Sequence, residues 1–311
     1  MIFAVVDVGS NTLRLLVSDV SGRGARPLRY ERVITRLGAG LGESGLLGEK
    51  ASENSLAALS RFAEIIRQSG TERTWCVGTS ALREARNARD FVERARRETG
   101  LEVEIVDGER EARLTARGVL SAIDGPREYV IMDIGGGSTE FIYSTDEPSG
   151  ARHLTVPVGV VKMVEAHMHA DPPTDEELAA LREAARGVSV VLKDEFGGGA
   201  KDGARLVGTA GTATTLAAID LGLERFDAGR VHNHVIPLAR LEEMASSLCS
   251  MPASERAGVK GLEPQRADLI IPGIILTISV MTAFSFPEIL ISSAGLLEGM
   301  AEELYERTIR R

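Results

Sequence analysis

The segment DIGGGSTE, residues 133–140, joins an apolar run at 129–134 to a second apolar run. Strand, glycine-rich turn and strand predict a β-hairpin whose tip has no side chains that exclude a ligand. Successive backbone N–H groups in such a turn form a concave nest for phosphate oxygens. The flanking carboxylates, Asp133 and Glu140, could hold a divalent cation that neutralises those oxygens. The predicted phosphate-binding residues of this nest are Gly135, Gly136, Gly137, Ser138 and Thr139.

The same pattern occurs near the N-terminus as DVGSNTLRLLV, residues 7–17, again after an apolar run. In an ungapped alignment Asp7 matches Asp133, and Arg14 matches Glu140. A duplicated unit predicts two similar lobes. We expect two nests, opposed across one cleft, to clamp a chain of phosphates. The residues of the first nest are Gly9, Ser10, Asn11 and Thr12, with Asp7 as its carboxylate.

The composition indicates an α/β protein of two domains. The chain has 311 residues, of which 43% are hydrophobic and only 4% aromatic, and this length allows two proper cores. The net charge of −9, from 36 basic and 45 acidic residues, disfavours non-specific nucleic-acid binding, which needs a positive surface field. A polyanionic substrate would therefore be bound locally, by metal, backbone amides and arginine.

Cysteine usage and the apolar segments bear on the location of the protein. Cys76 and Cys249 lie far apart and form no CxxC motif, which predicts a reduced, cytoplasmic protein. The N-terminus lacks the basic region of a signal peptide. Residues 269–286 contain no charge, but their Pro, Gly, Ser and Thr residues favour a helix buried inside a domain over a membrane span.

Each half is predicted to contain three strands followed by alternating helices and strands, with a boundary at 125–128. We expect lobe I at 1–124, with the C-terminal helix 296–311 packing back on it, and lobe II at 125–295. Thr174 and Glu177 form a capping box that opens a long helix. The predicted strands are 2–8, 13–20, 25–37, 74–78, 101–106, 129–134, 139–144, 153–157, 206–208 and 289–292. The predicted helices are 52–69, one near residue 87, 108–122, 174–195, one after residue 215, 238–250, 263–286 and one from residue 295.

Two further segments place small or charged residues where a strand becomes a helix. GTAGTATT, residues 208–215, offers unpaired N–H groups and a helix dipole to an anion, and its predicted contacts are Gly208, Thr209, Gly211 and Thr212. GTSALRE, residues 78–84, carries Arg83 as a candidate phosphate ligand. In GEREARL, residues 108–114, Glu109 and Glu111 are both candidate catalytic carboxylates, and helical periodicity does not distinguish between them.

Several other patterns carry little information about function. Gly40-x-Gly42-x-x-Gly45 matches a dinucleotide fingerprint, but the expected helix starts only near Ala51, so we interpret it as a glycine loop. The histidines have no Cys or third ligand near them and predict no metal site. The motifs of zinc proteases, P-loop enzymes and α/β-hydrolases are absent from the sequence.

Taken together, these segments resemble the exopolyphosphatase/guanosine pentaphosphate phosphohydrolase (Ppx/GppA) family. The resemblance runs in family order from residue 7 to residue 299, through DVGSNTLRLLV, RLGAGLGESG, TSALREARN, GEREARL, DIGGGSTE, PVGVVKM, DPPTDEEL, GTAGTATTLA, RADLI and AGLLEG. It implies an α/β, actin-like (sugar kinase/actin superfamily) fold of two ribonuclease-H-like lobes with an interlobe cleft.

The resemblance also implies an activity and its residues. It assigns the general base to Glu111, metal-linked roles to Asp133 and Glu140, and a position near substrate phosphate to Arg83. The implied cofactor is Mg²⁺ (or Mn²⁺), and the implied reaction releases terminal phosphate from polyphosphate or from guanosine pentaphosphate (pppGpp). Neither a nucleic acid nor a membrane is an expected partner, and a homodimer is compatible with the family.

The sequence departs from the family pattern in two places. No segment matches the C-terminal HD-like domain of long members, so we expect short polyphosphate chains to be the better substrates. Leu297 stands where the last motif usually has Arg, which weakens any phosphate role there. Two alternatives stay open, an ATP-dependent kinase of the same superfamily and a non-catalytic sensor of polyphosphate or alarmone.

Overall fold

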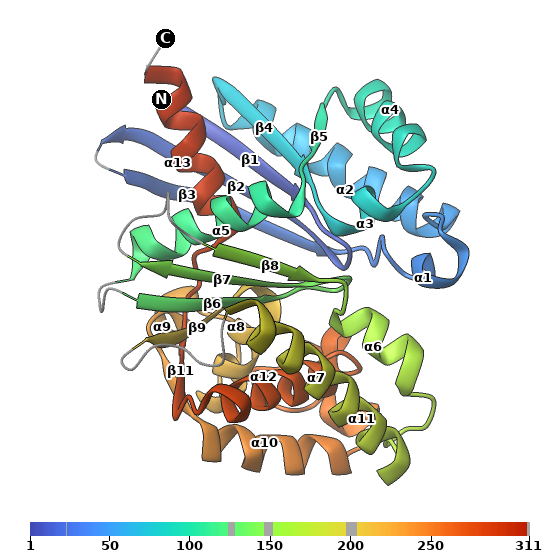
Figure 1. Ribbon diagram of the computed structural model, residues 1–311. Helices are drawn as coiled ribbons and strands as arrows, with labels where there is room; N and C mark the ends of the chain where they lie inside the picture. Colours follow the sequence, from blue (N-terminus) through green and yellow to red (C-terminus); the bar gives the residue numbers. More distant parts are fainter. Residues whose placement is uncertain (23, 124–127, 146–151, 197–203, 310–311) are drawn as a thin grey trace. The chain divides into compact units, whose positions relative to one another are not determined.

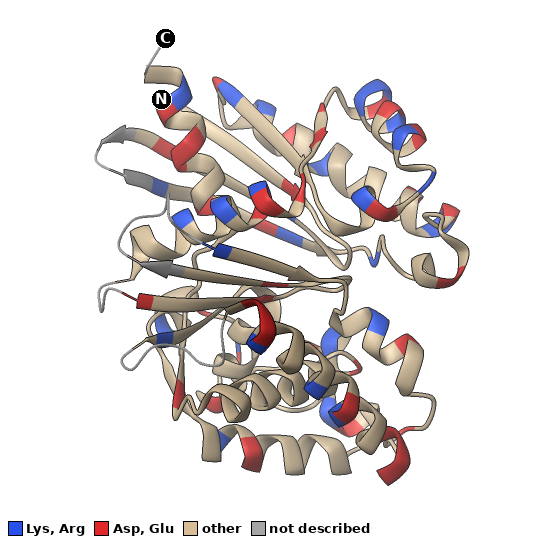
Figure 2. Cartoon of the chain, viewed as in Figure 1, with Lys and Arg blue, Asp and Glu red and all other residues tan. Residues whose placement is uncertain are grey.

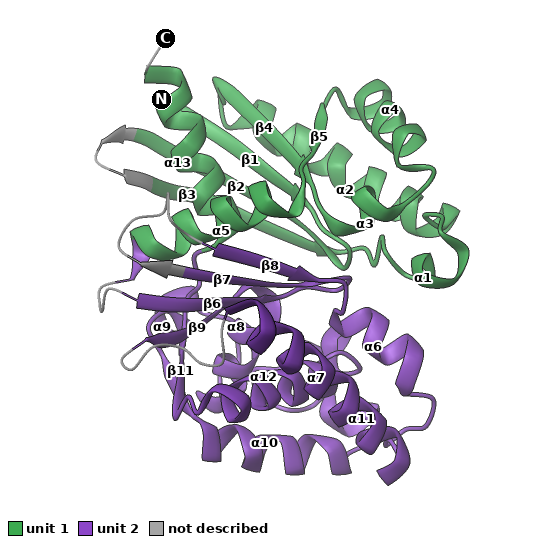
Figure 3. Ribbon diagram, in the orientation of Figure 1, with its two compact units in different colours: residues 1–121, 295–311 green, residues 122–294 purple. Residues whose placement is uncertain are grey.

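The computed structural model of the protein describes residues 1–22, 24–123, 128–145, 152–196 and 204–309. The chain divides into two compact units (Figure 3), unit 1 with residues 1–121 and 295–311, and unit 2 with residues 122–294. The chain thus leaves unit 1 once and returns to it with its last helix. Most of the predicted boundary at 125–128 lies outside the described residues.

Unit 1 is built on a five-stranded sheet in the order β3-β2-β1-β4-β5 (Figure 1). β1 pairs antiparallel with β2 and parallel with β4, because a hairpin follows β1 whereas a helical crossover leads to β4. The strands are β1 (Ile2–Val8), β2 (Thr12–Gly22), β3 (Gly24–Ile34), β4 (Arg73–Gly78) and β5 (Val103–Ile105). The helices are α1 (Leu41–Ser44), α2 (Glu49–Gln68), α3 (Ser80–Glu84), α4 (Ala88–Thr99), α5 (Gly108–Ala122) and α13 (Leu296–Ile309).

Unit 2 is built on a six-stranded sheet in the order β10-β11-β9-β6-β7-β8. Its strands are β6 (Glu128–Ile134), β7 (Thr139–Thr145), β8 (Arg152–Val156), β9 (Arg205–Thr209), β10 (Val235–Pro237) and β11 (Glu288–Ile291). Its helices are α6 (Val160–His167), α7 (Asp175–Phe196), α8 (Ala210–Asp220), α9 (Ala228–Val231), α10 (Leu238–Ser250), α11 (Ala253–Arg256) and α12 (Ile270–Phe284), with a 3₁₀ turn at Pro264–Arg266.

The two sheets have the same core topology. The strand order β8-β7-β6-β9-β11 in unit 2 corresponds to β3-β2-β1-β4-β5 in unit 1. In both sheets the central strand, β6 or β1, pairs antiparallel with the next strand of its hairpin and parallel with the strand on its other side. This internal duplication confirms the predicted α/β, actin-like fold class with two ribonuclease-H-like halves. The predicted interlobe cleft stays a prediction.

Separate apolar cores stabilise the two units. In unit 2 one cluster joins the sheet to α7, α8, α10 and α12, and α12 contributes a nearly continuous buried run that includes Ile271, Ile274 and Leu276. In unit 1 one cluster packs α2 and α4 on one side of the sheet, and a second, with Trp75, joins α5 and α13 to Val5 and Leu16. Because α12 is buried in the core of unit 2, its apolar sequence reflects core packing, as predicted. Within the described residues no helix combines the length and the apolarity that a membrane span requires.

Helices α5 and α13 cross at unusually short range in unit 1. A Cβ atom built on Gly118 would overlap the carbonyl oxygen of Gly295 and lie 2.7 Å from the nitrogen of Gly299. A Cβ built on Gly299 would overlap the carbonyl oxygen of Leu114. Only glycine fits at such a crossing, and ion pairs of Arg110 with Glu303 and of Arg117 with α13 carboxylates hold the helices together. The crossing fixes α5, whose first turn carries Glu109 and Glu111.

The predicted elements are mostly confirmed, and the differences have physical reasons. The single helix predicted at 263–286 is wrong, because the chain makes a 3₁₀ turn at Pro264–Arg266 and starts α12 only at Ile270. The Ala267 carbonyl between them accepts a hydrogen bond from the Arg256 side chain. The sequence reading also missed α1, α3, α6, α9, α11 and β10, all of them short. The loop predicted at 196–203 lies outside the described residues from 197 on.

Candidate functional site

The DIGGGSTE hairpin of unit 2 has the predicted form. β6 and β7 pair antiparallel, with Ile134 opposite Thr139 and Asp133 opposite Glu140. The turn closes by a hydrogen bond of 2.9 Å from the Gly135 N–H to the Ser138 carbonyl. This register places both carboxylates on one face of the hairpin, directly beneath its tip.

The N-terminal hairpin of unit 1 repeats this geometry residue for residue. Val8 lies opposite Leu13 and Asp7 opposite Arg14, and the Gly9 N–H donates to the Thr12 carbonyl at 3.2 Å. The alignment made from sequence alone is therefore reproduced in the register of both strand pairs. Opposite the aspartate position that the hairpins share, unit 1 has Arg14 where unit 2 has Glu140.

At both hairpin tips, carbonyl groups accept hydrogen bonds from a neighbouring segment, whereas the N–H groups that follow the turn-closing glycine donate none among the described residues. In unit 2 the carbonyls of Gly135 and Gly136 accept hydrogen bonds from the first turn of α6, at 3.0 and 2.9 Å. In unit 1 the carbonyls of Ser10 and Asn11 accept from residues 35, 36 and 38. Across the described residues, the N–H groups of Gly136, Gly137, Ser10 and Asn11 donate no hydrogen bond. Each tip can thus present consecutive N–H groups to a ligand, as a phosphate nest does.

The hydroxyl side chains near the tips are largely committed within the protein. Ser138 donates to the buried Glu140 carboxylate at 2.6 Å, and Thr139 donates to the Val158 carbonyl. In unit 1 the Ser10 hydroxyl accepts the Ala81 N–H at 3.1 Å, which ties this hairpin to the first turn of α3. The arrangement leaves backbone amides, rather than these hydroxyls, as the donors for a ligand.

The carboxylates below the tips are set for cation chemistry. Arg14 donates to one oxygen of the buried Asp7, at 2.8 Å through Nε. Within the part of the chain that the structure describes, the buried Oδ1 of Asp7 and the buried amide oxygen of Asn11 have no hydrogen-bond partner. Asp133 and Glu140 are like charges in direct cross-strand contact, which destabilises a sheet unless something compensates. Among the described residues, no cluster of three His, Cys, Asp or Glu side chains could hold a metal by itself.

The structure separates the two candidate glutamates of α5. Glu111 is only 9% exposed and accepts a hydrogen bond from Arg83 at 2.5 Å, and Arg83 also donates to the Val106 carbonyl. Glu109 is 55% exposed and pairs with Arg113 one turn along the helix. The helix begins at Gly108 because the Asp107 side chain caps it, accepting the Arg110 N–H at 2.7 Å. Glu111 and Arg83, predicted separately, therefore form one pair.

The GTAGTATT segment lies next to the unit 2 hairpin. The Thr212 hydroxyl donates to the carbonyl of Ile134, the residue before the glycines, and the Thr209 hydroxyl donates to the Ala294 carbonyl. Ala210, the first residue of α8, has a left-handed φ of 59°, a strained conformation of the kind that clusters at functional sites. The predicted contacts of Thr209 and Thr212 would therefore come from their backbone, since both hydroxyls are engaged.

Arg266 is a candidate site residue that the sequence reading did not assign. Its guanidinium lies against the start of α8, where a Cβ on Gly211 would be 2.7 Å from Nη2. The side chain is 10% exposed and its Nε donates to Glu263 at 3.2 Å. An arginine at a helix N-terminus opposes the helix dipole, and here the Glu263 carboxylate compensates for its charge. Its only sequence signal was the RADLI segment.

A family model described as the Ppx/GppA phosphatase family matches residues 16–308. The chain belongs to this family. It is 30% identical to exopolyphosphatase 2 of Mycobacterium tuberculosis over 97% of this chain and 98% of the relative. It is 29% identical to a guanosine-5'-triphosphate,3'-diphosphate pyrophosphatase of Photobacterium profundum, over 98% of this chain and 60% of that longer protein.

Solved structures of Ppx/GppA proteins share the fold of the whole chain. The exopolyphosphatase of Cytophaga hutchinsonii matches with a TM-score of 0.90 at 26% identity, and the Aquifex aeolicus family member with 0.82 at 30%, each over 98% of both chains. Leu297, the departure from the Ppx/GppA pattern noted above, is a core residue here with 2% exposure. Charged residues lie mainly on the helices (Figure 2), which leaves the strands that support the hairpins largely uncharged.

Proposed function

We propose that this protein releases terminal phosphate from inorganic polyphosphate, short chains above all, by attack of a water molecule that Glu111 activates, and that pppGpp is a second substrate. The observation that carries the proposal is the pair of hairpin tips whose consecutive N–H groups donate no hydrogen bond among the described residues. The printed names of the relatives supply the two substrate classes.

Binding follows from the nests and the arginines. Oriented N–H groups that need no reorganisation stabilise the charge that develops on phosphoryl oxygens as the loose transition state forms. The candidate phosphate-binding arginines are Arg83, which is paired with Glu111 in unit 1, and Arg266, which is paired with Glu263 beside α8 in unit 2. Because guanidinium groups bind phosphate oxygens bidentately, these side chains suit a polyphosphate chain.

The Glu111 carboxylate performs the proton transfer. Water attacks the terminal phosphorus, the bond from that phosphorus to the bridging oxygen breaks, and one water proton passes to Glu111. The products are one phosphate and a chain one phosphate shorter. Arg83 donates a hydrogen bond to one oxygen of the Glu111 carboxylate, Oε2. This contact fixes the orientation of the Glu111 side chain. A base positioned in this way contributes roughly 10²–10⁴-fold to the rate.

The residues present fit Mg²⁺, which is bound in phosphoryl-transfer sites by one or two carboxylates and the substrate phosphates. The candidate oxygen ligands are Asp7 in unit 1, whose Oδ1 has no hydrogen-bond partner among the described residues, and the cross-strand carboxylates Asp133 and Glu140 in unit 2. When bound, Mg²⁺ would offset the negative charge of the phosphate oxygens. Mn²⁺ has the same ligand preference and is the alternative ion.

A phosphate-release assay tests the proposal. The substrates are tripolyphosphate, polyphosphates of graded length and pppGpp, each with Mg²⁺ and with a chelator. We expect release without any acceptor, loss of release with the chelator, and falling turnover as the chain lengthens. Transfer that occurs only with an acceptor hydroxyl would instead identify a kinase, and binding without release would identify a sensor. Either result would rule the proposal out.

A second prediction concerns Gly159, which lies against the unit 2 hairpin tip. A Cβ built there would overlap the Gly136 carbonyl and lie 2.6 Å from the Ser138 nitrogen. Its φ of −132° suits any residue, so Gly159→Ala should act only by displacing the tip. Overpacking of this kind costs about 1–3 kcal/mol, and we expect KM for tripolyphosphate to rise about tenfold, equivalent to about 1.4 kcal/mol.

The matched control for this change is Gly187→Ala on α7, where a Cβ would meet no atom within 4 Å. This control should keep the wild-type KM. An unchanged KM in Gly159→Ala would argue against the nest of unit 2.

A further inference from the structure

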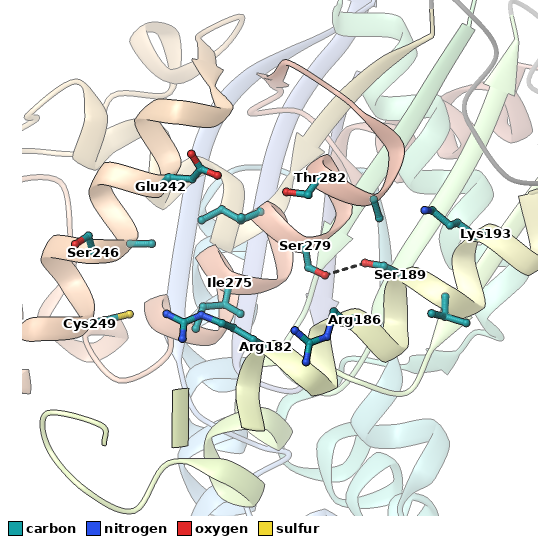
Figure 4. Close-up of a pocket in the computed structure, with 14 residues that line it drawn as sticks. Arg182, Arg186, Ser189, Lys193, Glu242, Ser246, Cys249, Ile275, Ser279 and Thr282 are labelled. Atoms are coloured by element: carbon teal, nitrogen blue, oxygen red, sulfur yellow. Dashed lines mark hydrogen bonds between the residues drawn. The ribbon is translucent and has the colours of Figure 1, made fainter. Parts of the chain in front are cut away.

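A pocket on unit 2 lies apart from the hairpins, between three helices (Figure 4). α12 packs against both α7 and α10, and all three helices contribute residues to the lining of the pocket. Its volume is about 640 Å³, within the range of about 300–1,000 Å³ that is typical of small-molecule sites. None of the residues that line it belongs to the site described above.

The lining of this pocket is aliphatic with a few polar groups. Ile275, Ile278 and Ala283 of α12 form the floor, and Val190 and Ala245 form parts of the walls. The polar groups on the walls include the hydroxyls of Ser189 and Ser279, which bond each other at 3.0 Å. No aromatic ring is among the lining residues, so the pocket suits a flexible aliphatic chain better than a flat ring.

The charges around the pocket are mainly positive. Arg182, Arg186 and Lys193 come from α7, whereas Glu242 of α10 is the one acidic residue of the lining. Arg186 is neutralised by Glu183, and Lys193 lies over the Phe284 ring. Among the described residues, Arg182 has no carboxylate partner. Figure 4 shows Arg182 and Arg186 together at one end of the pocket, so one cation there is available for a single anionic group.

We infer that this pocket binds a single-chain aliphatic carboxylate, a fatty-acid anion, with its head group on Arg182 and its chain along the floor formed by α12. An aliphatic floor beside one available guanidinium matches an amphiphile with one negative charge, because the chain loses contact with water while the head group gains a charge-assisted hydrogen bond. This inference does not depend on the proposed phosphatase activity, since the pocket and the hairpins share no residue.

Equilibrium dialysis with dodecanoate below its micelle-forming concentration tests the inference. We expect saturable binding of one molecule per chain, no displacement by tripolyphosphate, and no comparable binding of dodecyltrimethylammonium, which has a similar chain and the opposite charge. Arg182→Glu should weaken binding about tenfold or more, the size expected when a hydrogen bond to a charged group is lost. The matched control is Arg225→Glu, an exposed position of unit 2 outside the pocket, and it should bind normally. Phosphate release should be unchanged in both variants.

Alkylation of the Cys249 thiol tests whether the bound molecule lies in this pocket. Cys249 lines the pocket and is partly exposed, and burial raises the pKa of its thiol, so alkylation is run at alkaline pH. Cys76 serves as the internal control, because it is buried and burial raises its pKa to about 12. Dodecanoate should slow the alkylation of Cys249 in proportion to occupancy.

Four results would overturn the inference. They are the absence of saturable binding, equal binding of the cationic amphiphile, equal affinity of Arg182→Glu and Arg225→Glu, and binding that leaves the alkylation of Cys249 unchanged. Protection of Cys249 that grows with protein concentration without dodecanoate would identify a second copy of the chain as the occupant, and would count against the inference too.

Discussion

Glu111→Gln should lower phosphate release from tripolyphosphate by roughly 10²–10⁴-fold, the contribution of a positioned general base, while substrate affinity stays close to that of the wild type. Glutamine has the shape of glutamate and can still accept the Arg83 hydrogen bond through its amide oxygen, so the local structure should persist. What the variant loses is the ability to take a proton from water at neutral pH. The effect should therefore appear in kcat and spare KM.

The structure supplies a matched control on the same helical turn. Glu109→Gln removes the same charge two residues away, but Glu109 is exposed and its partner is Arg113. Exposed pairs of this kind contribute about 0.3–0.5 kcal/mol, so this variant should keep its turnover. Steady-state rates of both variants, with folding checked by circular dichroism, decide the matter. Comparable losses in the two variants, or a Glu111→Gln enzyme with nearly normal turnover, would refute the assignment of the base.

Much of the fold was readable in the sequence because its signals are local. The gapless match of the two hairpins predicted the strand register, since a one-residue slip would have moved every buried side chain to the other face. The capping box was confirmed, with Thr174 and Glu177 each accepting the other's backbone N–H at 3.2 Å or less. α5 begins and ends where its periodicity predicted. Short elements such as α6 escaped because their stability comes from tertiary contacts, here with the hairpin carbonyls.

The candidate site could be predicted only in part, because its residues come together through tertiary contacts that local sequence patterns do not show. Periodicity left Glu109 and Glu111 equivalent, and only the fold shows that the strand-to-helix turn carrying Arg83 approaches one of them. Arg266 reaches α8 from a segment more than fifty residues away in the chain, so no local pattern could reveal its position. The hydroxyls of Thr139, Thr209 and Thr212 donate to backbone carbonyls of their own unit, so the predicted phosphate contacts of these residues would come from their backbone N–H groups.

Arg256 carries the second large expected effect, on the stability of unit 2. It is among the largest fully buried side chains of the described residues, with 2% exposure. Its guanidinium donates to the carbonyl of Ala267 at 2.8 Å, to the carbonyls of Leu248 and Met251, and to Asp171 at 3.1 Å. Two of these carbonyls belong to the C-terminal end of α10, where a cation is also favoured by the helix dipole.

Arg256→Ala should destabilise the protein by about 3–5 kcal/mol, because each buried acceptor left without its donor costs about 1–3 kcal/mol and Arg256 donates to three backbone carbonyls. The substitution leaves buried carbonyl oxygens without donors and opens a cavity, and each of these effects is unfavourable by itself. Arg256→Lys should recover only part of the loss, because one ammonium group cannot reach all the acceptors of the planar fork. Urea unfolding followed by far-UV circular dichroism gives the free energy of unfolding of each variant.

The control for this measurement is Arg240→Ala, which removes an arginine of the same unit that is 45% exposed and paired with Asp220 and Glu243. Exposed ion pairs contribute at most about 1 kcal/mol, so the midpoint should move little. Hydrogen exchange then locates the effect, because peptides from α10 and the 3₁₀ turn should lose protection before those from the sheet of unit 1, which has its own core. If Arg256→Ala unfolds at the same urea concentration as Arg240→Ala, the buried guanidinium contributes no more than a surface charge, and its contacts do not set the stability of unit 2.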